Sequence, residues 1–215
     1  MKSVRHRTAV PSGALLLPTL MLTGRSAGAV YAQPAAELKR LHEAGAIVKV
    51  ARGYYAAVPV GRTGHGWLPS TEDLTAGLAS AVYGPGSGAV WGLSAARMHG
   101  ALPRAIAAGF ACGPRQHRPI RLTVRAGEVT FRMRDPERLA LDYVETELGP
   151  GLVTSIAQTI LDLSSRPFVE DADPRREAVL NLMGVVDPDE LVDLARSVRG
   201  HTALGRARAL VRSVE

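Results

Sequence analysis

The sequence predicts an α/β (α+β) protein, in which an N-terminal winged helix-turn-helix precedes a larger mixed α/β domain with a central sheet and C-terminal helices. Three observations predict this fold: a helix-spaced segment that runs directly into a β-hairpin, strand patterns in the middle of the chain, and helix-spaced apolar residues near its end. With 215 residues, 46% hydrophobic and 21% charged, the chain has the composition of a folded globular protein.

The first predicted element is a short helix over residues 34–45. Pro34 suits its first turn and Gly45 suits the position just after its last turn. Three apolar residues share one of its faces: Ala35, Leu38 and Leu41.

Two β-rich runs, residues 47–50 and 54–58, follow this helix at once. The three residues between them include Gly53, at a turn position that favours glycine. A helix followed immediately by a tight hairpin is typical of the end of a winged helix.

The apolar stretch of residues 14–22 has two interpretations. It would supply the first helix of the winged helix-turn-helix, although Pro18 interrupts it. It also has the layout of a secretory signal, with basic residues before it and small residues such as Ala29 and Ala32 after it. A single cysteine, Cys112, allows no intramolecular disulfide and favours a cytoplasmic setting. No run of eighteen apolar residues exists, so we predict no transmembrane helix and no membrane partner.

Glycines and prolines between residues 59 and 69 predict a linker, so we place a DNA-binding domain at residues 1–60 and a second domain at residues 61–215. In the second domain, Ser94 is expected to cap a helix that ends near His99. The strand pattern of residues 129–134 predicts that Val129, Phe131 and Met133 face inward. The other predicted strands are residues 89–91, 105–112, 120–124, 139–146 and 151–153, and the other helices are residues 71–83, 156–163, 188–198 and one from about residue 202.

Positive charge is concentrated near the N-terminus. The chain has a formal net charge of +6, and residues 1–66 hold nine lysines and arginines against two acidic residues. A basic module on a nearly neutral remainder predicts double-stranded DNA as a partner.

The predicted helix and hairpin divide the DNA contacts between them. Arg40, beside Lys39 on the exposed part of the helix, is the expected contact to a guanine edge. Lys49 and Arg52 are better placed for phosphates, and one of the two tyrosines is expected to pack against the helix. The predicted DNA-binding residues are Arg25, Lys39, Arg40, Lys49, Arg52, Tyr54 and Tyr55.

Catalytic interpretations have less support, and we predict no catalytic residue, metal or cofactor. The six histidines lack metal-ligand spacing, and residues 84–88 resemble a phosphate loop only in their glycines. Cys112 is expected to be a buried structural thiol. One alternative is a DNA-cleaving or DNA-modifying enzyme with a winged-helix targeting domain, and another is a secreted protein of unknown role. The enzyme would use a metal and the carboxylates of Asp135, Asp142, Glu145 and Glu147.

Three stretches resemble the AbiEi antitoxin family of type IV toxin–antitoxin systems. Residues 41–55 resemble its wing, residues 90–102 contain its Ser-Ala-Ala-x-x-His-Gly pattern at Ser94 and His99, and residues 153–163 resemble its Val-Thr-Ser-x-x-Arg-Thr-Leu-Leu-Asp-Leu helix. Asp162 matches the aspartate of that helix, whereas Gln158 stands where the family often has arginine. From spacing alone, Asp162 could instead be an exposed residue that pairs with Arg166.

The resemblance implies an antitoxin that binds its own promoter as a transcriptional autorepressor. It further implies that residues 61–215 form an AbiEi-like antitoxin domain, which counteracts a cognate nucleotidyltransferase-like toxin.

Overall fold

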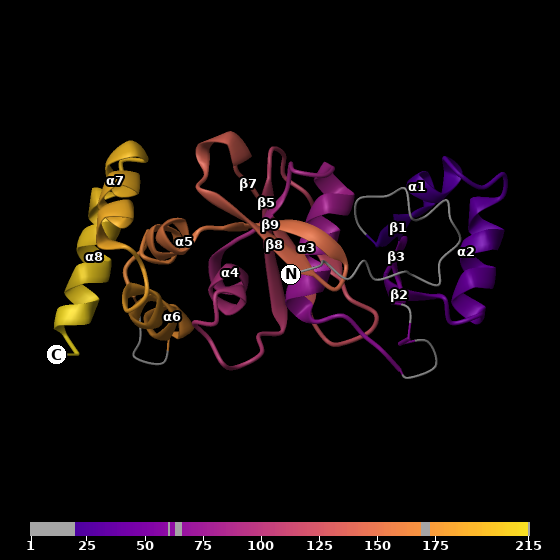
Figure 1. Cartoon of the computed structure of the whole chain (residues 1–215), viewed down its shortest axis with the longest axis horizontal. Helices are drawn as coiled ribbons and strands as arrows, with labels where there is room; N and C mark the ends of the chain where they lie inside the picture. Colours follow the sequence, from indigo (N-terminus) through magenta and orange to yellow (C-terminus); the bar gives the residue numbers. More distant parts are fainter. Residues whose placement is uncertain (1–19, 60, 63–65, 169–172, 215) are drawn as a thin grey trace.

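The computed structural model of the chain describes residues 20–59, 61–62, 66–168 and 173–214. Its elements form three regions along the long axis: a small N-terminal sheet with two helices, a central six-stranded sheet, and a group of C-terminal helices (Figure 1). The predicted mixed α/β fold is confirmed.

The N-terminal region has a winged-helix-like order of elements, with a three-stranded antiparallel sheet in the spatial order β1-β3-β2. The prediction that residues up to 22 form a first helix is wrong for Met21 and Leu22, because both are buried and pair with β3 as part of a strand. Residues 14–19 lie outside the described residues. The elements are β1 (Met21–Thr23), α1 (Gly24–Gly28), α2 (Pro34–Glu43), β2 (Ile47–Ala51) and β3 (Tyr54–Ala57).

The small sheet is covered on both faces. On one face, Leu22 and Ile47 pack with Leu38 and Leu41 of α2. The other face contributes to a larger apolar cluster with the remainder of the structure, which we call the body (residues 66–214). That cluster joins Met21, Val50, Ala56 and Val58 to Leu74, Leu78, Val129, Phe131 and Leu148. The small sheet therefore shares a hydrophobic core with the body, while the predicted boundary at residue 60 stays a prediction.

The body is built on a mixed sheet in the spatial order β6-β7-β5-β4-β9-β8. Figure 1 shows α3 (Thr71–Tyr83) between this sheet and the N-terminal region, and α4 (Gly92–Met98) on the side of the C-terminal helices. Met133, which the alternation predicted to face inward, is 63% exposed, because it is the last residue of its strand. The strands are β4 (Ala89–Val90), β5 (Ala108–Gly113), β6 (Ile120–Arg121), β7 (Glu128–Met133), β8 (Leu141–Thr146) and β9 (Gly149–Thr154).

Four C-terminal helices pack around a second apolar cluster with α4. Asp173, Asp187 and Ser155 cap three of these helices through their side chains. The helices are α5 (Ile156–Leu163), α6 (Pro174–Met183), α7 (Pro188–Ser197) and α8 (His201–Arg212), and a short 3₁₀ helix, η2 (Pro136–Arg138), precedes β8. Within the described part of the chain, no helix is long and apolar enough to cross a membrane.

Candidate nucleic-acid interface

Helix α2 is held in place by its apolar face and by its two ends. Pro34 occupies the first helical position, and Leu38 and Leu41 are buried, whereas Ala35 is exposed. Beyond the helix, Gly45 has a φ of 70°, and the N–H of Ala46 donates to the carbonyl of Leu41 at 2.9 Å. This is a Schellman ending, which needs a left-handed residue and so explains the glycine.

The outward charges of α2 are paired with each other. The Arg40 guanidinium donates two hydrogen bonds to Glu37, at 3.0 Å from Nε and 2.6 Å from Nη2. Lys39 Nζ lies 3.8 Å from a Glu43 oxygen, and both side chains are largely exposed. The predicted guanine-reading residue therefore has a local acidic partner, whereas Lys39 is only loosely held.

The hairpin of β2 and β3, the wing, carries Arg52 at its turn. Gly53 there has a φ of 83°, as the three-residue turn predicts. In the register of the sheet, Lys49 lies opposite Tyr55, and Tyr55 packs against His42 of α2 with ring centroids 6.5 Å apart. The exposed Lys49 is thus on the same face of the wing as α2.

The two tyrosines point to opposite faces of the wing. Tyr55 belongs to the cluster with α2, and Tyr54 packs at the cluster shared with the body. The expectation that one of them packs against the helix is confirmed. Burial raises the pKa of Tyr54, so its hydroxyl stays a neutral hydrogen-bond donor at physiological pH.

Arg25 is exposed in α1, the short helix before α2. A capping box fixes its start: the N–H of Ser26 donates to Thr23 Oγ1 at 3.1 Å, and the N–H of Thr23 donates to Ser26 Oγ at 2.8 Å. The structure therefore brings Arg25, Lys39, Arg40, Lys49 and Arg52 to the exposed surface of one small region.

The body forms hydrogen bonds with β2, the strand at the outer edge of the wing. Thr123 donates its N–H to the carbonyl of Val50 and its Oγ1 hydrogen to the carbonyl of Lys49, both at 2.8 Å. Ala51 and Leu122 form an antiparallel bridge next to them. Nothing local in the sequence signalled this contact, because its partners lie more than seventy residues apart.

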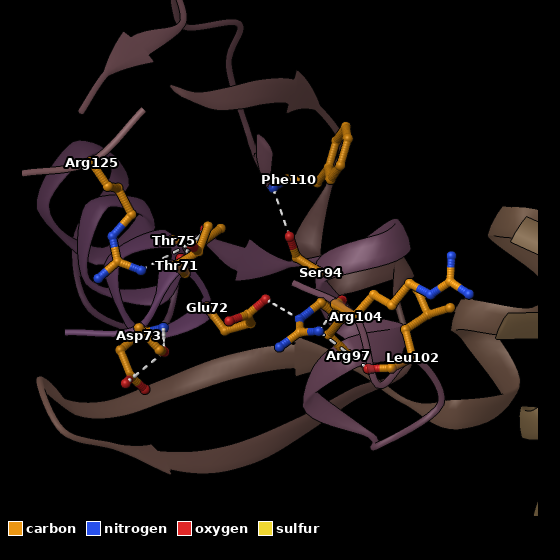
Figure 2. A network of polar contacts seen from close by, with 11 residues as sticks. Thr71, Glu72, Asp73, Thr75, Ser94, Arg97, Leu102, Arg104, Phe110 and Arg125 are labelled. Atoms are coloured by element: carbon orange, nitrogen blue, oxygen red, sulfur yellow. Dashed lines mark hydrogen bonds and ion pairs between the residues drawn. The ribbon is translucent and has the colours of Figure 1, made fainter. Parts of the chain in front are cut away.

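Two residues that match the AbiEi pattern, Ser94 and His99, make hydrogen bonds within the body. The N-cap of α4 is Trp91, so the expectation that Ser94 caps this helix is wrong. Ser94 is instead fully buried in the third helical position, where its hydroxyl accepts a 3.0 Å hydrogen bond from the N–H of Phe110 (Figure 2). His99 ends the helix as expected, and its Nε2 lies 2.7 Å from the Thr154 carbonyl of β9.

Asp162, the third matching residue, has a largely buried side chain, and the alternative that it is exposed and pairs with Arg166 is wrong. It forms an ion pair with Arg134, the residue that follows β7, and accepts a 2.9 Å hydrogen bond from Gln158 Nε2. Burial raises the pKa of Asp162 despite the opposing effect of Arg134. The cation that pairs with Asp162 is Arg134, just after β7, while Gln158 keeps a hydrogen bond to Asp162 at the position where the family often has arginine.

Figure 2 also shows a polar network around Arg97, close to Ser94, that sequence reasoning missed. Arg97 of α4 donates to Glu72 of α3 at 2.5 Å, and its guanidinium also contacts the carbonyls of Leu102 and Arg104. These contacts join α3 to α4 inside the body, and none of them involves a predicted DNA-binding residue.

The carboxylates considered for metal chemistry have other surroundings. Asp135 caps η2, Glu147 accepts a 3.0 Å hydrogen bond from Trp67, and Asp142 and Glu145 are exposed on β8. The described residues contain no group of three or more His, Cys, Asp or Glu that could hold a metal ion. Burial raises the pKa of Cys112 to about 12, so this thiol is protonated at neutral pH.

The fold thus defines a mixed α/β protein with a winged-helix-like N-terminal region. No protein-family model and no curated protein matches the sequence. Among solved structures, the crystal structure of the RV2827C protein from Mycobacterium tuberculosis is similar, with a TM-score of 0.55 and 18% sequence identity over 90% of this chain and 72% of that one. At this identity the likeness shows the fold alone.

Proposed function

We propose that the chain is a DNA-binding transcriptional regulator, with α2 in the major groove and the wing on the adjacent backbone. One observation carries the proposal: Lys39, Arg40, Lys49 and Arg52 are all exposed, on a helix and a hairpin that pack together in the winged-helix order. A helix can read base edges in the major groove, and arginine or lysine side chains on the hairpin can neutralise phosphates.

The test is binding to the DNA just upstream of the chain's own gene, measured by gel shift with the full-length protein. Lys39→Ala combined with Arg40→Ala is expected to weaken binding by at least about tenfold. The matched control is Arg208→Ala combined with Arg212→Ala. Both arginines are exposed on α8, at the far end of the molecule from α2, and replacing them removes the same amount of positive charge (Figure 1). Equal binding by the wild type and the α2 variant would refute the role of α2.

We further propose that the regulator is an antitoxin that counteracts a nucleotidyltransferase-like toxin through the body. Support comes from the resemblance of residues 90–102 and 153–163 to the AbiEi family. Since Ser94 is fully buried and Asp162 nearly so, their contribution is to hold the body together, and a toxin would contact other residues.

Co-expression with the neighbouring gene tests the antitoxin role by growth rescue. The full chain is needed, because the wing and the body share a hydrophobic core and a truncated body would expose it. If both the wild type and the α2 double variant rescue growth, neutralisation of the toxin does not depend on DNA binding by α2. If the neighbouring gene is not toxic when expressed alone, the antitoxin proposal fails while the DNA-binding proposal stands.

A further inference from the structure

An open hollow lies where the tip of the wing meets the body. Its volume is about 500 Å³, and it is lined by Arg52 and Tyr54 of the wing and by Arg118, Arg121 and Glu128 of the body. We call it the wing-tip hollow. The charge count of residues 1–66 could not reveal it, because two of its arginines come from the part of the sequence that is nearly neutral overall.

The arginines of the hollow, Arg52, Arg118 and Arg121, are exposed, and none forms an ion pair within the described residues. Glu128 of β7 lies opposite Arg121 of β6 in the register of the sheet. Elsewhere in the body, Arg97 and Arg134 each pair with a carboxylate. Three guanidinium groups around a hollow with one acidic lining residue create a local positive potential that attracts an anion.

The wing cannot move away from the body without breaking several contacts. The two hydrogen bonds from Thr123 and the bridge between Ala51 and Leu122 lie directly beside the hollow, and apolar side chains from both sides pack beneath them. These contacts hold the backbone at Arg121 close to the backbone at Arg52. A duplex that contacts the wing tip is therefore within reach of the body arginines that line the hollow.

We propose that the wing-tip hollow binds backbone phosphate of the DNA duplex that α2 reads, so that Arg118 and Arg121 extend the DNA-binding surface onto the body. The inference rests on the proposed function, because it assigns the ligand of the wing tip to the same duplex. Arginine is suited to phosphate through its planar set of N–H donors, and the Tyr54 hydroxyl adds a neutral donor. These contacts carry no base information and should strengthen binding to any duplex.

The experiment is a salt titration of the full-length protein by fluorescence anisotropy, with a labelled duplex from the upstream region and an unrelated duplex of equal length. Arg118→Ala combined with Arg121→Ala should weaken binding to both duplexes and reduce the log–log salt slope by about 1.8, since each phosphate contact contributes about 0.9. Arg208→Ala combined with Arg212→Ala should leave the slope unchanged. Thermal unfolding checks that both variants are folded.

The outcomes separate the two proposals. If the wild type binds the upstream duplex and the Arg118/Arg121 variant has the same slope and affinity, the wing-tip inference is overturned and the regulator proposal stands. If the variant instead loses rescue of a co-expressed toxin with an unchanged slope, the hollow binds a protein, which also overturns the inference. If the wild type binds no DNA, both proposals fail.

Discussion

Arg40 and Glu37 form a two-point contact on the exposed side of α2, with donor–acceptor distances of 2.6 and 3.0 Å. The hydrogen bond from Arg40 lowers the pKa of Glu37, so the carboxylate stays ionised at neutral pH. In the proposed DNA complex, the residue best suited to read a guanine is thus held by a negative charge that itself faces phosphate. A guanine contact that used the same Nε and Nη2 donors would require the contact with Glu37 to open.

Replacing the carboxylate should therefore strengthen DNA binding. Glu37→Gln removes the negative charge and frees the Arg40 guanidinium, and we expect affinity for the upstream duplex to rise by about two- to fivefold at low salt, with a smaller gain at high salt. Glu43→Gln is the matched control, because Lys39 is already largely exposed at 3.8 Å from Glu43. Weaker binding by Glu37→Gln, measured by anisotropy, would show that Glu37 orients Arg40 for DNA rather than competing with it.

Ser94 provides a stability prediction independent of DNA. Ser94→Ala removes the fully buried hydroxyl that accepts the hydrogen bond of the Phe110 N–H, which should cost about 1–3 kcal/mol in the free energy of unfolding. Chemical denaturation measures the loss. Ser197→Ala is the control, since Ser197 is exposed at the end of α7 and should change stability by less than about 0.5 kcal/mol. Equal stability of the two variants would contradict the structural role assigned to Ser94.

Local patterns predicted the elements whose causes lie within a few residues. Pro34, Gly45 and Gly53 mark α2 and the wing because helix ends and tight turns have strict backbone requirements. Contacts between distant segments had no such signal. Asp162 and Arg134 are 28 residues apart, and the body residues of the wing-tip hollow lie more than sixty residues beyond Arg52.

Helix α6 and strand β1 show two further limits of sequence reasoning. Helix α6 is absent from the elements that the sequence predicted, because its apolar residues have little helical periodicity. Met21 and Leu22 continue an apolar run that suits a helix or a strand equally well, and only pairing with β3 decides between them.

Two glycines should respond oppositely to alanine. Gly45 has a φ of 70° in the Schellman ending of α2, so Gly45→Ala should destabilise the protein by about 1 kcal/mol. Gly205 lies within α8 with no atom near the position of an added methyl group, so Gly205→Ala should stabilise it by about 0.5–1 kcal/mol. Thermal unfolding of both variants gives the comparison. A stabilising Gly45→Ala would mean that α2 ends differently.

The partly buried ion pair of Arg134 and Asp162 gives a prediction with a defined pH dependence. Arg134→Met leaves the ionised Asp162 without its cation, and we expect a loss of about 3–5 kcal/mol at neutral pH. The pKa of Asp162 is already raised by burial and should rise further in the variant. An ionised carboxylate with a raised folded-state pKa destabilises the fold above that pKa, and protonation relieves the penalty as the pH falls through it.

The difference in unfolding free energy between Arg134→Met and the wild type should therefore shrink as the pH is lowered from neutral through the raised pKa of Asp162. Arg132→Met is the comparison, because Arg132 also lies over the Trp91 ring but is exposed and forms no ion pair with Asp162 in the described structure. Its charge lowers the pKa of Asp162 less than that of Arg134 does, so its removal should give a smaller pH dependence. Adding Asp162→Asn to Arg134→Met should recover stability at neutral pH and remove the Asp162 titration from the unfolding free energy of the variant. A loss that stays constant across this pH range would assign the effect to lost packing over Trp91 rather than to the uncompensated charge.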